Sequence, residues 1–180
     1  VLVLAVLVWV MLRQIGVLYE RIAPMGALMD SAGPEVGEPG PVFRLDSLTG
    51  GEVNIGAVGR SQLVFFLSPT CPVCKQLLPV LASIRNDERA WLDVILASDG
   101  EAPRHVDFIR KARLSAFPYV LSADLGMTYR VQRLPFAVLT DAQGVVRAKG
   151  LVNTREQLES LFNALKAGVA SLQQYVAARA

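Results

Sequence analysis

Cys71 and Cys74 lie three positions apart and are the only cysteines in the chain. They follow an apolar run and precede a segment with helical periodicity, so Cys71 is predicted to lie at a helix N-terminus. Unpaired backbone N–H groups and the helix dipole stabilise an anion there, and they lower the pKa of a thiol below its usual value of about 8.5. One helical turn brings Cys74 within reach of Cys71. We therefore interpret Cys71 as the nucleophile and Cys74 as the resolving cysteine of a thiol–disulfide exchange site.

The residues around the pair fit this chemistry better than metal binding. Pro72 suits the first helical turn, where its missing N–H is not needed. Two cysteines and one histidine are too few for a four-ligand structural zinc site within one chain, and we predict no metal. The histidine, His105, lies between Arg104 and Val106 near the start of an amphipathic helix. We interpret it as a solvent-exposed helix residue rather than as a general base.

Charge argues against a nucleic-acid partner. The chain carries 18 basic and 16 acidic residues, for a net charge of +2, whereas nucleic-acid binding is typical of a strongly basic domain. One local cluster of cations does occur, on the predicted helix after the cysteines: Arg104, Arg110, Lys111 and Arg113. We interpret this cluster as a solvent-exposed helix face, with a partner-docking patch as the alternative.

Strands and helices alternate in the part of the chain that must position the cysteines. The predicted strands are 42–48, 52–55, 63–67, 91–97, 118–121, 136–140 and 145–149, and the predicted helices are 72–89, 102–114, 125–131 and one that starts at Thr154. The apolar run 63–67 is predicted to be a buried central strand that leads into the cysteines. The order of these elements, which closes with a hairpin and a helix, indicates an α/β fold with a mixed sheet.

The N-terminal part of the chain is different in composition. Residues 1–12 are apolar without exception, and as a helix they would span about 18 Å of a hydrocarbon core of roughly 30 Å. We predict that they are the end of a truncated transmembrane helix; a cleaved signal peptide or a buried core strand are the alternatives. Residues 13–30 keep a helical spacing and are predicted to form a juxtamembrane helix. Residues 31–41 contain three prolines and three glycines and are predicted to be a semi-rigid linker, so the folded domain is expected to cover 42–180.

Residues from about 39 to 165 resemble proteins of the thioredoxin fold. Pro79 lies five residues beyond Cys74, where thioredoxins carry a proline that kinks the helix. The sequence Leu134-Pro135-Phe136 occupies the place of the family's cis-proline, and residues 138–145 resemble the hairpin that follows. The resemblance implies a cis bond before Pro135. It also implies that four residues support the site or bind substrate: Pro72, Val73, Leu134 and Pro135.

Residues 13–28 and 65–75 are similar to the MauD family of methylamine dehydrogenase accessory proteins. This resemblance implies a single-pass protein of the bacterial inner membrane with its thioredoxin-like domain in the periplasm. It further implies that the domain forms or isomerises disulfides in the small (β) subunit of methylamine dehydrogenase. Other maturation proteins of methylamine utilisation and a membrane redox partner are implied as further partners. The Cys71–Cys74 disulfide is expected to be the redox centre, with no separate cofactor.

The sequence also departs from thioredoxin. Phe65 stands where thioredoxins carry a buried aspartate, and Thr70 replaces the tryptophan before the first cysteine. The direction of the redox reaction is therefore not predicted from these residues. Two alternative functions stay open: a thiol reductase of cytochrome c maturation and a non-catalytic chaperone for an apo-subunit. A peroxidase is disfavoured, because Thr70 directly precedes Cys71 and does not have the Thr-x-x-Cys spacing that such enzymes need.

Overall fold

The computed structural model describes residues 33–167, with the side chains of residues 33–162. The strands are β1 (Phe43–Asp46), β2 (Glu52–Ile55), β3 (Ser61–Phe66), β4 (Leu92–Ser98), β5 (Tyr119–Leu121), β6 (Phe136–Thr140) and β7 (Val146–Leu151); the helices are α2 (Pro72–Asp87), α3 (Ala102–Ala112), α4 (Ala123–Thr128) and α5 (Arg155–Ala167). The helices predicted over 1–12 and 13–30 lie outside the described residues. Within residues 33–167, no helix has both the length and the apolar character needed to cross a membrane.

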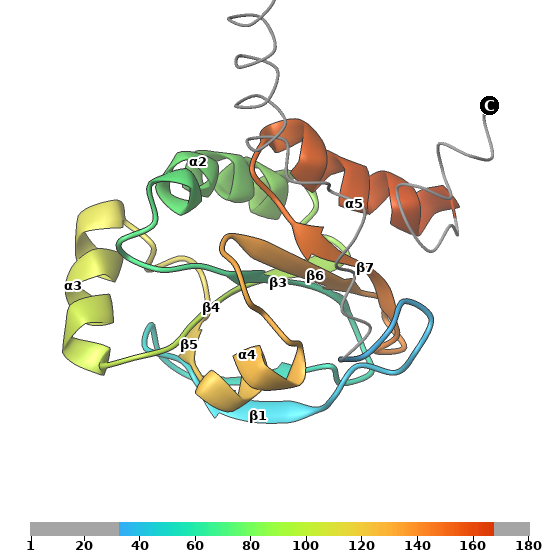
Figure 1. The fold of residues 1–180 in the computed structure, drawn as a ribbon, viewed down its shortest axis with the longest axis horizontal. Coiled ribbons are helices and arrows are strands. Elements are labelled where there is room, and N and C mark those ends of the chain that lie inside the picture. Colours follow the sequence, from blue (N-terminus) through green and yellow to red (C-terminus); the bar gives the residue numbers. More distant parts are fainter. Residues whose placement is uncertain (1–32, 168–180) are drawn as a thin grey trace, which may run out of the picture. The chain divides into compact units, whose positions relative to one another are not determined.

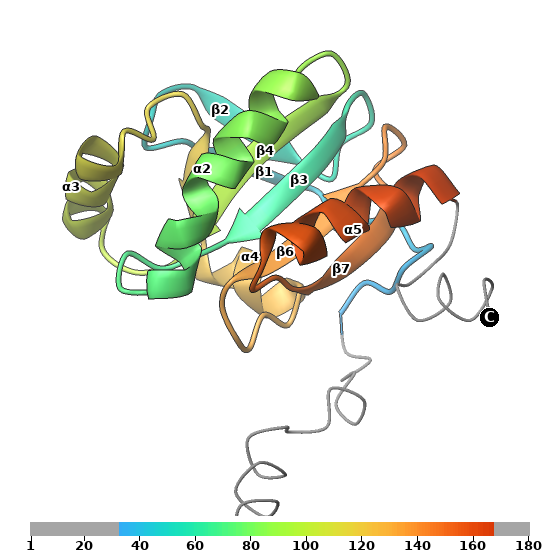
Figure 2. The same cartoon turned by 90° about the horizontal axis from the view of Figure 1, so that it is seen from above.

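A five-stranded mixed sheet, ordered β5-β4-β3-β6-β7, forms the centre of the fold, as Figures 1 and 2 show. β3 pairs in parallel with β4 and antiparallel with β6. All six residues of β3 are buried, which confirms the central strand predicted from the apolar run over 63–67. β1 and β2 form a separate antiparallel hairpin. The predicted α/β fold with a mixed sheet is therefore confirmed.

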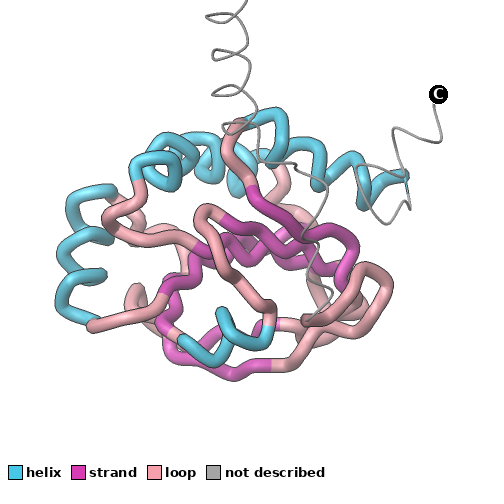
Figure 3. The backbone as a smooth tube through the Cα atoms, in the orientation of Figure 1, coloured by secondary structure: helices cyan, strands magenta, loops and turns pink. Residues whose placement is uncertain are grey.

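Side chains that alternate along β3 divide the core between the two faces of the sheet. Leu63 and Phe65 belong to the cluster formed with α2, α3 and α5. Val64 and Phe66 belong to the cluster formed with α4 and the β1–β2 hairpin. Figure 3 shows α2 and α5 on one side of the sheet and α4 with β1 on the other. Because β3 is packed on both faces, the position at which the chain enters the following loop is fixed by the core.

Short polar side chains cap the N-termini of α4 and α5. Ser122 Oγ accepts a hydrogen bond from the N–H of Leu125 at 3.1 Å, so α4 starts at Ala123 rather than at the predicted residue 125. Before α5, Thr154 Oγ1 accepts from the N–H of Gln157 at 3.2 Å. These hydrogen bonds satisfy N–H groups that have no partner within the helix.

Part of the predicted linker 31–41 belongs to the folded domain. The N–H of Gly37 donates to the carbonyl of Val146 at 2.8 Å, and the N–H of Val146 donates to the carbonyl of Glu38 at 2.9 Å. Gly40 likewise donates to the carbonyl of Gly144 at 2.8 Å. Proline and glycine prevent a helix here, but extended backbone can still pair with the β6–β7 hairpin. The folded domain therefore begins before the predicted residue 42.

Both outer strands of the five-stranded sheet are short or partly covered. β5 has only three residues, and Ser47 forms an isolated bridge with Val120 beside it. At the other edge, Pro39 forms an isolated bridge with Val145, next to the start of β7. β7 carries two half-buried basic residues: Arg147 and Lys149. Short strands, proline and charged side chains on an edge strand are features that limit pairing with another chain.

The prediction that His105 is solvent-exposed is wrong. Its side chain is only 2% exposed, and it lies between β5 and the loop before α3. Nε2 lies 2.9 Å from the carbonyl oxygen of Asp99, and Nδ1 lies 2.8 Å from the hydroxyl of Tyr119. Because a carbonyl oxygen only accepts, Nε2–H donates to Asp99 and Nδ1 accepts from Tyr119. Both partners come from outside the helix of His105, so the local sequence does not reveal them.

This burial gives the domain a pH-dependent stability. Desolvation by burial lowers the pKa of His105 below its usual value of 6.5. At a pH between the two pKa values, the unfolded chain binds a proton that the folded chain does not bind. The stabilisation from neutral His105 is therefore complete above pH 6.5 and is lost as the pH falls below it. We expect urea unfolding to give a lower free energy at pH 5.5 than at pH 7.5.

His105→Phe tests this assignment, because the chain has a single histidine. We expect the variant to be less stable at pH 7.5, since Tyr119 loses its acceptor, but to lose less stability than the parent between pH 7.5 and pH 5.5. An unchanged pH dependence in the variant would show that carboxyl groups, and not His105, cause the loss.

Candidate active site

Cys71 is the N-cap residue of α2. Its backbone is extended, with φ −80° and ψ 112°, and its Sγ accepts a hydrogen bond from the N–H of Cys74 at 3.1 Å. Pro72 follows at the start of the helix, and the first turn contains no acidic side chain. The Sγ atom thus lies at the positive end of the helix dipole, where negative charge on sulfur is stabilised. This is the place that the sequence predicts for Cys71.

Cys71 and Cys74 form a disulfide, with their Cα atoms 5.3 Å apart. The two cysteine residues differ in their exposure to solvent. Cys74 is 0% exposed and packs in the apolar cluster that contains Phe65 and Leu78, whereas Cys71 is half-buried. A thiolate that approaches from solvent can therefore reach the sulfur of Cys71 but not that of Cys74.

The loop between β3 and α2 is anchored by one buried hydrogen bond to β4 and by hydrogen bonds within the loop. Ser98 Oγ, at the end of β4, donates to the carbonyl of Leu67 at 2.7 Å. Further along the loop, the N–H of Cys71 donates to the carbonyl of Ser68 at 3.0 Å. The hydroxyls of Ser68 and Thr70 lie 3.0 Å apart. The role of Ser98 is not predictable from local sequence, because its partner Leu67 lies 31 positions away, directly after β3.

The bond between Leu134 and Pro135 is cis, as the resemblance to thioredoxins implies. Pro135 is buried and directly precedes β6, whose first residue, Phe136, pairs with Phe66 at the end of β3. The cis bond therefore lies at the same end of the sheet as the loop that carries Cys71. Leu134 is 38% exposed and so presents apolar surface at that end.

The remaining candidate residues lie on the first turn of α2. Pro72 is exposed and Val73 is half-buried, so both contribute surface between the cysteines. Lys75 is exposed and directly follows Cys74. The positive charge of Lys75 thus lies in the first turn of α2, next to the disulfide in the sequence. Among the described residues, no group of three or more histidine, cysteine, aspartate or glutamate side chains is arranged to hold a metal ion.

Solved structures with the same fold place the chain in a class. A putative thiol:disulfide interchange protein DsbE from Chlorobium tepidum matches with a TM-score of 0.66 and 20% identity over 73% of this chain and 98% of that chain. StoA from Bacillus subtilis matches with a TM-score of 0.58 and 25% identity over 70% of this chain and 98% of that chain. No protein-family model matches. The fold and the Cys-x-x-Cys disulfide at a helix N-terminus define a thioredoxin-like protein.

Comparison of whole sequences narrows this class. The methylamine utilization protein MauD of Methylorubrum extorquens is 46% identical over 178 residues, which cover 97% of this chain and 86% of that protein. The protein of the same name from Paracoccus versutus is 45% identical over 170 residues, which cover 94% of this chain and 85% of that protein. The chain belongs to the MauD family of methylamine utilization proteins.

Proposed function

We propose that this chain is a protein thiol–disulfide oxidoreductase that forms or isomerises disulfides in the small (β) subunit of methylamine dehydrogenase. The observation that carries the proposal is the disulfide at the start of α2, in which Cys71 is accessible and Cys74 is buried. Membership of a methylamine utilisation family supports the choice of substrate.

The reaction begins with attack by a substrate thiolate on Sγ of Cys71. The bond between Cys71 and Cys74 breaks as a mixed disulfide forms between the substrate and Cys71, and Cys74 leaves with the electron pair. Apolar surroundings disfavour a charged sulfur, so Cys74 takes up a proton and becomes a thiol.

A second substrate thiolate then attacks the substrate sulfur of the mixed disulfide. The substrate gains a disulfide, and Cys71 leaves as a thiolate stabilised by the N-terminus of α2. Two electrons have moved from the substrate dithiol to the cysteine pair. Isomerisation uses the same steps from the reduced pair, with Cys71 attacking a wrong disulfide and leaving when another substrate thiolate replaces it.

The proposed setting is the periplasmic side of the bacterial inner membrane, with residues 1–12 as part of a single transmembrane anchor. The apolar composition of this segment supports the anchor. A membrane redox partner would reoxidise the cysteine pair after each disulfide is formed, and other maturation proteins of methylamine utilisation would share the substrate. The pair is the only redox centre in the proposal, so no cofactor is required.

Trapping the intermediate tests the proposal. In Cys74→Ala, the free Cys71 thiolate can still attack a substrate disulfide and form a mixed disulfide, but the route in which Cys74 displaces the bound partner is removed. We expect non-reducing electrophoresis and mass spectrometry of methylamine-grown cells to show the dehydrogenase small subunit bound to Cys71. The matched control is the double variant Cys71→Ala/Cys74→Ala, which should trap nothing and should not support dehydrogenase assembly.

Two outcomes would contradict the proposal. Apocytochrome c as the trapped protein would indicate a thiol reductase of cytochrome c maturation instead. Normal dehydrogenase assembly with the double variant would indicate a chaperone whose cysteines are not needed.

A further inference from the structure

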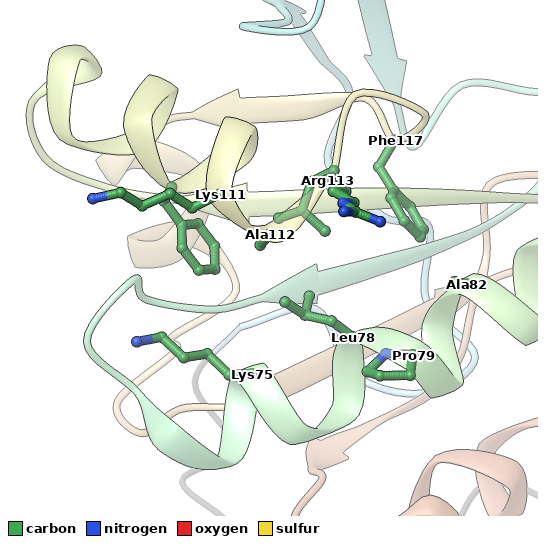
Figure 4. A pocket seen from close by; sticks show the side chains of 10 residues that line it. Lys75, Leu78, Pro79, Ala82, Lys111, Ala112, Arg113 and Phe117 are labelled. Atoms are coloured by element: carbon green, nitrogen blue, oxygen red, sulfur yellow. The ribbon is translucent and has the colours of Figure 1, made fainter.

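A groove of about 500 Å³ lies between α2 and α3, as Figure 4 shows. Its apolar wall comes from three parts of the fold: Leu78, Pro79 and Ala82 on α2, Phe108 and Ala112 on α3, and Phe117 in the loop before β5. The groove follows one face of α2, because positions 75, 78, 79 and 82 repeat with helical spacing. It therefore begins one residue after Cys74 and extends along the helix.

The edge of this groove is positively charged. Lys75, Lys111 and Arg113 line it, and none of the described lining residues is acidic. The nearby Asp107 forms an ion pair with Lys111 at 2.6 Å, but it also pairs with Arg110, so one carboxylate faces two cations. Figure 4 shows Lys75 and Lys111 on opposite helices at one end of the groove, with Arg113 toward the end formed by Phe117. An occupant of complementary chemistry combines apolar groups with negative charge.

We propose that the groove binds a segment of the partner polypeptide in which acidic residues flank one or two large apolar side chains. The proposal rests on the proposed function, because a partner that forms a mixed disulfide with Cys71 is a polypeptide held beside this groove. The groove volume lies within the range of roughly 300–1,000 Å³ that is typical of sites for small molecules, which suits one or two large side chains rather than a longer stretch of chain. Its three cations add electrostatic attraction to the apolar contact.

Helix geometry fixes where this segment lies relative to the partner's cysteine. Leu78 and Ala82 are seven and eleven residues beyond Cys71, which corresponds to about 10–16 Å along the axis of α2. An extended chain covers about 3.3 Å per residue. The acidic and apolar segment therefore lies about three to five residues from the cysteine that reacts with Cys71.

Peptides without cysteine test the groove separately from the redox chemistry. The probe is a fluorescent ten-residue peptide that alternates glutamate with leucine and phenylalanine, and its partner probe has lysine in place of glutamate. With the full 180-residue chain, we expect the acidic peptide to bind at least about tenfold more tightly than the basic one, and the difference to shrink at high salt. Backbone NMR shifts should change at Ala82, Ala112 and Phe117.

Charge variants on α2 and α3 provide a matched comparison. Lys111→Gln and Lys75→Gln remove cations that line the groove, and each should weaken binding of the acidic peptide about two- to fivefold. Arg110→Gln is the control: Arg110 lies on the same helix as Lys111 and pairs with the same aspartate, Asp107. Arg110 does not line the groove, so binding of the acidic peptide should stay unchanged. Thermal melts will show that the three variants remain folded, since all three side chains are exposed.

Three results would overturn the groove proposal: no binding of the acidic peptide, equal binding of both peptides, or equal weakening by Arg110→Gln and Lys111→Gln. Displacement of the acidic peptide by dodecanoate at a lower concentration than the peptide itself would also overturn it, because the groove would then prefer a small carboxylate amphiphile. None of these results depends on the mixed disulfide, so the proposed redox function stands or falls with the Cys74→Ala experiment instead.

Discussion

Replacing Cys71 with serine is expected to reduce thiol–disulfide exchange by at least about a thousandfold, within the range seen when a covalent nucleophile is removed. The remaining thiol of Cys74 is 0% exposed, so it cannot take over the attack. Replacing Cys74 with serine has a different effect, because the accessible Cys71 keeps its place at the N-terminus of α2. The measurement is the rate of reaction of each reduced variant with glutathione disulfide.

The two single variants control for each other. Cys74→Ser should still form a mixed disulfide with glutathione, and that adduct should persist. Cys71→Ser should react only after denaturation. The reverse pattern, with reactive Cys74 and silent Cys71, would contradict the assigned roles of the two cysteines.

Replacing Phe65 with alanine is expected to lower the free energy of unfolding by about 3–5 kcal/mol, the usual cost of removing a buried phenylalanine ring. Phe65 is 0% exposed on the central strand and belongs to the apolar cluster that surrounds Cys74. The ring occupies the strand position where thioredoxins carry an aspartate, so in this chain the position contributes packing rather than proton transfer. Urea unfolding of the oxidised protein measures the loss.

Val58→Ala is the matched control, because it also shortens an apolar side chain but at a position that is 80% exposed. We expect its free energy of unfolding to stay within about 0.5 kcal/mol of the parent. A loss below about 1 kcal/mol in Phe65→Ala would contradict the packing shown by the structure.

Elements with strong local signals were predictable from the sequence. The apolar run over 63–67 matches β3, and the leucines of α2 mark its buried face. The place of Cys71 at a helix N-terminus also follows from local sequence, because a strand, a turn and a helix are contiguous in the chain. The cis bond before Pro135 was expected only from the resemblance to thioredoxins, since nothing in the local residues requires it.

Features that depend on distant parts of the chain were not predictable. His105 is buried because Tyr119 and Asp99 come to it from other elements. Gly37 and Gly40 look like a linker by composition, yet their N–H groups pair with the β6–β7 hairpin. The groove arises from the spacing between α2 and α3, which no residue pattern specifies.

The short or partly covered edges of the sheet affect how easily a bound partner can leave the domain. A polypeptide that presents reactive cysteines is incompletely folded and exposes unpaired backbone groups, which add readily to an open strand edge. Here β5 is short and lies beside Ser47, and the approach to β7 is occupied at Pro39. Under the proposed function, we therefore expect a partner to be held by side-chain contacts and by one exchangeable sulfur bond rather than by a ladder of backbone hydrogen bonds. Turnover is then expected to end with dissociation of the product and not with co-aggregation of the domain and its partner.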